Sequence, residues 1–226
     1  RGAALTQSLD HLILQDPAAA TAAAKATVDR LAKAAVHYLR SLTGSAAAGG
    51  SSARHDRLAA AVSDTRAYLD RIELPASTSP EFGEIKGLYH ILDHLDRLLY
   101  RCTQTERISE LPKDRRLRRL ARVLALATAG FEDVTRPEHC ETTLNRLRRL
   151  MRAQQQSQRD RLISEAADGT LPDDIAWTRL DAVRWLHRVA YHLWRMRVHL
   201  NLLDSNAAAD LGTARGDEAR LDAGLD

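Results

Sequence analysis

Histidines at helical spacing are the first residues of this sequence that could carry chemistry. His90 and His94 are four residues apart, which would place both imidazoles on one face of a helix. Such a pair can chelate a transition metal, but the Glu of the His-Glu-x-x-His zinc-protease pattern does not stand between them. Both fall on the polar side of a helical wheel, as do His192 and His199. We therefore expect surface histidines rather than metal ligands.

Nucleophilic catalysis has little support in the sequence. It contains no Gly-x-Ser-x-Gly elbow and no glycine-rich phosphate loop. Cys102 lies in an apolar helical arc, which indicates a core thiol. Cys140 stands beside His139 near an expected helix start, but adjacent residues on a helix do not face each other. We predict a protein that is not an enzyme and that has no cofactor.

The basic residues say more about possible partners than the histidines and cysteines do. Segment 113–161 holds 13 basic and 6 acidic residues, a local net charge of +7 in a chain whose total is only +3. Within it, Arg115, Arg118, Arg119 and Arg122 form one helical stripe. Such a stripe suits anionic lipid headgroups, an acidic partner or nucleic acid, and it also suits a plain solvated face. Interleaved aromatic residues and helix-turn-helix spacing do not accompany it, so nucleic acid is not an expected partner.

The composition predicts an all-helical protein. Of 226 residues, 44% are hydrophobic, and only 11 are Gly and 6 are Pro, which is too few for a turn-rich β-sandwich. Two cysteines are too few for a disulfide framework. The chain has no apolar run of about 18–20 residues, which a membrane span needs, and no signal peptide. Because it begins with Arg1 rather than Met, we expect a soluble domain cut from a longer protein.

Helix start and stop signals divide the chain into six long helices. Asp16-Pro17 and Ser79-Pro80 provide a cap followed by a proline at the first helical position. Leu111-Pro112 is expected to end the third helix, and Gly169 the fifth. Stretch 44–52 is an expected linker, and 205–226 an expected disordered acidic tail. The predicted helices are 17–43, 53–73, 80–108, 113–134, 137–168 and 173–204.

Two short segments repeat at an offset of 91 residues. Leu95-Asp96-Arg97-Leu98-Leu99-Tyr100-Arg101 shares its Leu, Arg and Tyr with Leu186-His187-Arg188-Val189-Ala190-Tyr191-His192. Each segment falls on the third of three expected helices. The sequence therefore predicts one domain, residues 1–204, as a six-helix bundle of two three-helix repeats, about 15–108 and 113–204.

This duplication, with a short motif on each third helix, resembles the PhoU-like family. The opening from Ser8-Leu9-Asp10 through Asp16-Pro17 into an alanine-rich helix resembles the cytoplasmic C-terminal region of bacterial sodium/phosphate cotransporters. The resemblance covers most of residues 8–204. It implies a PhoU-like fold and a regulatory or interaction role in sodium-dependent phosphate transport or in the control of phosphate uptake.

The chain departs from the family at its metal motif. There, an acidic residue is followed four positions later by an aspartate, and such pairs can hold metal ions. Here Asp96 and His187 occupy the first position, while Tyr100 and Tyr191 occupy the second. The resemblance therefore carries over no metal site. Both tyrosines are expected to bury their rings and to hydrogen-bond an opposing polar group.

The expected binding residues fall into two groups. One group would form a seam between the repeats or face a ligand: Asp96, Arg97, Tyr100, His187, Arg188 and Tyr191. The other would face a partner or a lipid surface: Arg115, Arg118, Arg119 and Arg122.

The resemblance also implies a setting for these residues. It places the domain at the cytoplasmic face of the bacterial inner membrane, as part of a membrane protein. The partner would be the transmembrane transporter region of the same or another chain, with an anionic lipid surface beside it. The sequence does not decide between a monomer and a homodimer.

Two alternatives from other classes remain at this point. A metal-binding helical protein would use Asp96, His90, His94 and His187 as ligands. A nucleic-acid-binding regulator would use the arginine-rich helices against phosphate groups.

Overall fold

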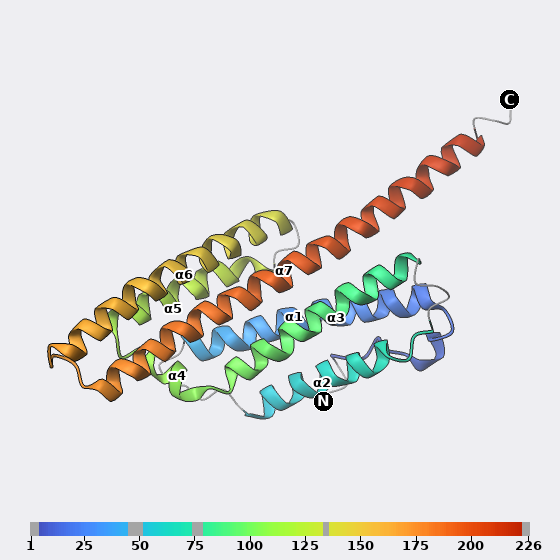
Figure 1. Ribbon diagram of the computed structural model, residues 1–226. Helices are drawn as coiled ribbons and strands as arrows, with labels where there is room; N and C mark the ends of the chain where they lie inside the picture. Colours follow the sequence, from blue (N-terminus) through green and yellow to red (C-terminus); the bar gives the residue numbers. More distant parts are fainter. Residues whose placement is uncertain (1–4, 45–51, 74–78, 133–135, 223–226) are drawn as a thin grey trace.

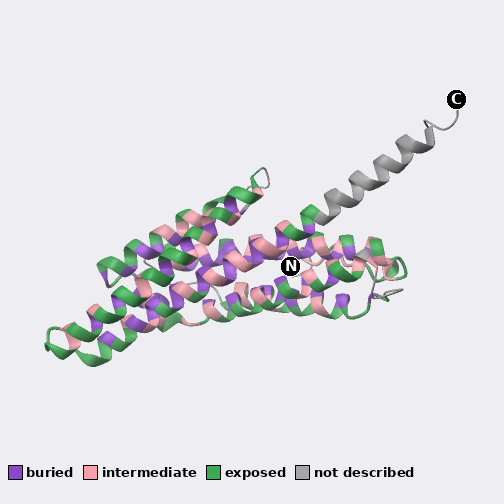
Figure 2. Cartoon of the chain, turned by 45° about the horizontal axis from the view of Figure 1, so that its top comes forward, coloured by how far each residue is buried: buried purple, intermediate pink, exposed green. Residues whose placement is uncertain are grey.

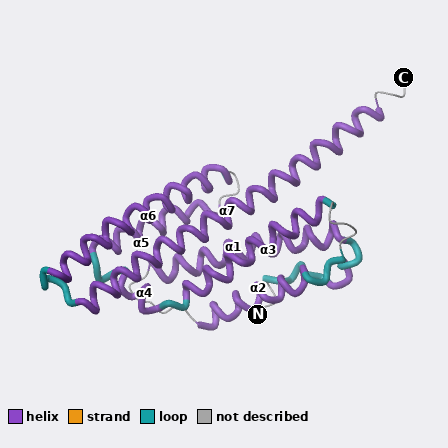
Figure 3. Tube along the Cα trace, viewed as in Figure 1, coloured by secondary structure: helices purple, strands orange, loops and turns teal. Residues whose placement is uncertain are grey.

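The computed structural model describes residues 5–44, 52–73, 79–132 and 136–222, with only the backbone described for Pro80, Glu132 and 206–222. The described part is helical and contains no strand (Figure 3), which confirms the all-α prediction. The linker predicted at 44–52 lies largely outside it. Short 3-10 helices span His11–Ile13 and Gly130–Glu132. The α-helices are α1 (Pro17–Gly44), α2 (Ser52–Leu69), α3 (Pro80–Cys102), α4 (Thr105–Glu110), α5 (Arg115–Ala129), α6 (Pro137–Ala167) and α7 (Asp173–Asp222).

The caps expected from the sequence hold the helix starts. One carboxylate oxygen of Asp16 accepts hydrogen bonds from the backbone N–H groups of Ala18 and Ala19 at 3.1 Å. The Ser79 hydroxyl accepts from the N–H of Phe82 at 3.3 Å. Gly169 follows the end of α6 with φ +71, a left-handed conformation that a side chain disfavours. The two caps explain why the predicted starts of α1 and α3 agree with the structure, and the predicted starts of α6 and α7 agree as well.

The third helix ends earlier than Leu111-Pro112 predicts. The Thr103 hydroxyl donates to the carbonyl of Tyr100 at 2.8 Å, and the indole N–H of Trp185 donates to the carbonyl of Arg101 at 2.9 Å. Side chains thus satisfy two carbonyl groups at the end of α3, so the helix can stop at Cys102. The residues beyond the break form the separate short helix α4.

The helices pack as two groups of three joined along two lines. α1, α2 and α3 contact one another, and so do α5, α6 and α7. Between the groups, α3 lies along α7 and α1 along α5 (Figure 1). The buried positions follow the inner faces of the helices, whereas the outer faces and hairpin ends are exposed (Figure 2). One continuous core therefore spans both groups.

The contact between α3 and α7 is fixed near both of its ends. Trp185 of α7 is bonded to the carbonyl of Arg101 at one end. At the other end the helices approach so closely that a Cβ added at Gly87 would lie 2.9 Å from Cδ2 of Leu203. Glycine at position 87 permits this approach.

The tail differs from the prediction of disorder from residue 205. α7 continues as helix to Asp222, and residues 223–226 lie outside the described part. The alanine run 207–209 supports helix locally, because alanine has the highest helix propensity. Among the described residues, α7 and the other helices lack a stretch both long and apolar enough to cross a bilayer.

Candidate functional site

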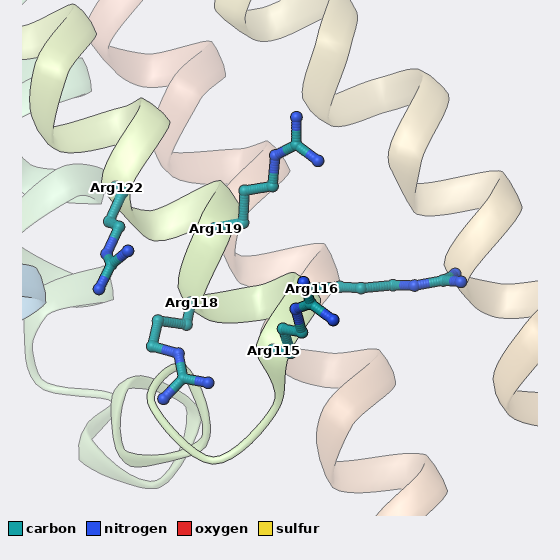
Figure 4. Close-up of a pocket in the computed structure, with 5 residues that line it drawn as sticks. All are labelled: Arg115, Arg116, Arg118, Arg119 and Arg122. Carbon is teal, nitrogen blue, oxygen red and sulfur yellow. The ribbon is translucent and has the colours of Figure 1, made fainter.

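Five exposed arginines on α5 form the most distinctive surface of the molecule. We call them the arginine surface: Arg115, Arg116, Arg118, Arg119 and Arg122. They surround an open space of about 650 Å³. Figure 4 shows their guanidinium groups spreading outward, Arg118 and Arg122 to one side and Arg116 and Arg119 to the other. Because all five come from one helix, the space is an open surface between side chains, suited to a broad partner rather than to an enclosed small molecule.

The amphipathic pattern of α5 dictates which residues face outward. Leu117, Leu120, Ala121, Leu124 and Thr128 are buried, and their spacing of three and four residues defines one face of a helix. The remaining positions in the first two turns are all arginine. Burying the leucines therefore forces the arginines outward.

Asp114 fixes the start of α5 within the bundle. One carboxylate oxygen accepts from the N–H groups of Arg116 at 2.8 Å and Leu117 at 3.0 Å. The other lies 3.5 Å from a guanidinium nitrogen of Arg161 on α6 and 3.6 Å from one of Arg179 on α7. Burial alone would raise the pKa of Asp114, but these N–H groups and cations lower it below its ordinary value. One carboxylate thus holds three helices together beneath the arginine surface.

Among the described residues, the arginine surface has no polar partner. Within the part of the chain that the structure describes, none of its five guanidinium groups makes an ion pair or a hydrogen bond. Neighbouring cations three and four residues apart repel one another on a helix. The arrangement is therefore mildly unfavourable for folding and well suited to attracting an anion.

The predicted seam residues on α3 face away from α7. Asp96 is 2.8 Å from a guanidinium nitrogen of Arg66 on α2, and Arg97 is exposed. Tyr100 is 60% exposed, with the Arg101 guanidinium 5.5 Å from its ring centroid. The expectation that Tyr100 buries its ring is wrong, because its position on α3 faces solvent rather than α7.

The predicted residues on α7 lie closer to the contact between α3 and α7. The Tyr191 ring packs edge-on against His94 of α3, with centroids 6.0 Å apart. His187 is half-buried, and burial, followed by the charges of Arg188 and Arg152, lowers its pKa. Arg188 is exposed. Of the six predicted residues, Tyr191 is thus the one whose ring contacts reach across from α7 to α3.

Histidines occupy the seam instead. His192 is only 3% exposed, and its Nδ1 lies 3.2 Å from Nδ1 of His94, which is half-buried. The His90 and His199 rings stack with centroids 5.0 Å apart. The prediction that His192 lies on the surface is wrong. The polar sides of the two helical wheels face each other across the contact between α3 and α7, which a wheel for one helix does not reveal.

The metal-binding alternative finds no assembled ligand set. In the described part of the chain, no group of three or more His, Cys, Asp or Glu residues is placed to hold a metal ion. Asp96 is paired with Arg66, and His94 is bonded to His192. Cys102 is buried, and burial raises the pKa of its thiol to about 12, as expected for an unreactive core residue.

Sequence reasoning missed two features near the ends of α5 and α7. Asp114 was not recognised as a cap, although Asp before an arginine-leucine helix is a standard start signal. Trp177 is 61% exposed and lines a hollow of about 250 Å³ with Leu162 and Ile163 of α6. Only the packing of α6 against α7 brings that hollow together.

Comparison of the chain with protein-family models, with curated proteins and with solved structures finds no match.

Proposed function

We propose that this chain is a non-catalytic docking domain that binds anionic lipid headgroups through the arginine surface. The single observation that carries the proposal is the set of five exposed arginines within two turns of α5, none of which has an ion-pair partner among the described residues. An extended anionic surface can reach all five at once, whereas an enclosed ligand would reach only a few. Each cationic side chain near such a surface contributes about 1 kcal/mol.

The PhoU-like resemblance suggests where the domain would bind a membrane. We propose that the domain belongs to a sodium-dependent phosphate transporter and lies beside its transmembrane region at the cytoplasmic face of the membrane. The chain order supports a duplication, because α1, α2 and α3 correspond in order to α5, α6 and α7. The contacts fit it too, because α3 packs against α7 and α1 against α5, the pairs of helices that a duplication would make equivalent.

Vesicle binding tests the lipid proposal directly. The chain is mixed with vesicles containing roughly 30% phosphatidylserine, and with neutral vesicles, at about 0.1 M salt, where screening is moderate. We expect binding to the anionic vesicles only. Arg118→Glu/Arg122→Glu is expected to weaken it by about two orders of magnitude or more, because two attractions become repulsions.

A matched control separates the surface from the total charge. Arg57→Glu/Lys86→Glu changes the net charge equally at exposed positions on α2 and α3. We expect its vesicle binding to fall by less than about threefold, because screening limits the influence of distant charges. Equal losses in both variants would overturn the proposal.

Nucleic acid is an outcome of the same test. A short DNA duplex is titrated at the same salt concentration. Tighter binding to DNA than to anionic vesicles, lost in Arg118→Glu/Arg122→Glu, would replace the lipid proposal with the nucleic-acid alternative. Weak or absent DNA binding together with strong vesicle binding supports the proposal.

A further inference from the structure

Four histidines and two aromatic rings meet where the two groups of helices touch. His94 and His192 face each other through their Nδ1 atoms, 3.2 Å apart. His199 stacks on both His90 and His94, with centroids 5.0 Å and 6.0 Å apart. Tyr191 packs against both His94 and His192. This cluster, which we call the histidine seam, comprises His90, His94, Tyr191, His192, Trp194 and His199.

The Nδ1–Nδ1 contact requires a particular protonation state. A hydrogen bond between two imidazole nitrogens needs one N–H donor and one bare acceptor. When both rings are protonated, each Nδ1 carries a hydrogen, so the bond is lost and two cations face each other. His192 is 3% exposed, so water offers its charged form little compensation.

The cations around the pair make protonation harder still, whereas Asp93 of α3 favours the protonated form of His94. On α3 the cations are Arg97 and Arg101, and the His90 ring stacks on His199 beside the pair. On α7 the groups that oppose protonation are Arg188, Arg195 and His199.

Among the residues that the structure describes, Asp93 of α3 is the acid whose charge acts on the pair. Asp93 already lies 3.1 Å from Arg66 of α2. From α6, the Arg148 guanidinium packs over Trp194 at 4.5 Å from the ring centroid, which adds another cation beside the seam. The surroundings of His94 and His192 are therefore strongly positive.

We propose that the His94–His192 pair makes the contact between α3 and α7 an acid-sensitive joint between the two groups of three helices. Neutral imidazoles hold the joint closed, and double protonation loosens it. The inference rests on the seam alone and does not depend on what the arginine surface binds.

The direction of the pH effect follows from the shifted groups. Burial, then the charges of His199 and Arg195, lower the pKa of His94 from its ordinary 6.5 to about 4. Burial, then the charges of His94 and Arg101, lower the pKa of His192 to about 4. The loosened state protonates more readily than the closed one. Closure is therefore complete above about pH 6.5 and is lost progressively as the pH falls toward 4.

Hydrogen–deuterium exchange of the whole chain tests the joint. Exchange is compared at about pH 5 and about pH 7.5 after correction for intrinsic rates, and we expect peptides spanning 88–100 and 186–200 to lose at least about tenfold protection at the lower pH. Peptides from 117–128 in α5 should change much less. Equal protection of the seam at both pH values would overturn the proposal.

Two variants assign the effect to the pair. His94→Gln leaves an amide that can still bond His192 but cannot become a cation, and we expect it to keep most of its protection at low pH. His37→Gln, at an exposed position of α1, should lose protection as the wild type does. A His94→Gln protein that retains the full pH response contradicts the proposal.

Imidazole NMR of the wild type keeps the test valid if His94→Gln does not fold. We expect the His94 and His192 signals to have the lowest midpoints, well below about 6.5, and to move together with the Tyr191 and Trp194 ring signals. Ordinary midpoints for all nine histidines would overturn the proposal.

Discussion

The arginines of α5 and those packed around α7 share a side chain but have opposite surroundings. Arg161 and Arg179 meet the carboxylate of Asp114, and Arg197 is 4% exposed and bonds Asn201 at 2.7 Å. Arg118 and Arg122 are exposed and, among the described residues, unpaired. The bundle thus uses arginine as a structural link where an oxygen partner is supplied. The arginines left without one are free to serve a function.

Removal of Asp114, the acid that pairs with the structural arginines, should have the largest effect on stability. Asp114→Ala takes away the cap of α5 and the carboxylate that faces Arg161 and Arg179, although Arg161 keeps its contacts with Glu165 and Gln158. We expect a loss of about 3 kcal/mol in the free energy of unfolding, measured by urea denaturation. Asp64→Ala, at an exposed position of α2, is the control and should change it by less than about 0.5 kcal/mol. Similar losses in the two variants would show that Asp114 has no special role.

Removing a structural arginine should cost somewhat less. Arg197→Ala breaks the bond to Asn201, which itself donates to Glu141 of α6 at 2.7 Å. It also leaves a void beside Phe131, whose ring centroid is 5.8 Å from the guanidinium carbon. We expect a loss of about 2 kcal/mol by the same measurement. A stability equal to that of the wild type would place Arg197 with the unpaired arginines.

Acid should erase the contribution of the Asp114 charge. Asp114→Asn keeps a capping oxygen but loses the attraction to Arg161 and Arg179. We expect it to be about 1–2 kcal/mol less stable than the wild type at neutral pH. The pKa of Asp114 lies below its ordinary 3.8 in the folded chain. The carboxylate therefore stabilises the fold above that value, and the gap between the two proteins should close as the pH falls below it. A gap that persists at low pH contradicts this assignment.

The smallest expected effect lies on the arginine surface itself. Arg118→Ala, Arg119→Ala and Arg122→Ala should each change the free energy of unfolding by less than about 0.5 kcal/mol, because no partner is lost. Slight stabilisation fits the relief of repulsion along α5. A loss above about 1 kcal/mol from any of them would break the distinction between the two sets of arginines.

Local chemistry made most helix boundaries predictable. Caps such as Asp16 and Ser79 act over three residues, so they can be recognised in the sequence. The arginine surface was predicted for the same reason, since helical spacing alone places Arg115, Arg118, Arg119 and Arg122 together and only Arg116 was left out.

The histidine seam could not be predicted in this way. A wheel drawn for one helix treats its polar edge as solvent-facing. His192 is buried because α3 lies along that edge of α7, a tertiary fact with no local signal. The early end of α3 has the same origin, because Trp185 lies 84 residues from the carbonyl it bonds.

The contact between α3 and α7 is fixed on both sides of the His94–His192 pair. Leu203 packs against Gly87 on one side, and Trp185 donates to the carbonyl of Arg101 on the other. Protonation of the pair would therefore separate the helices locally, between these two contacts, without separating them completely. When the pair loses its protons, the two contacts still align the helices in the same register. We therefore expect the joint to reopen and reclose over many cycles without loss of register.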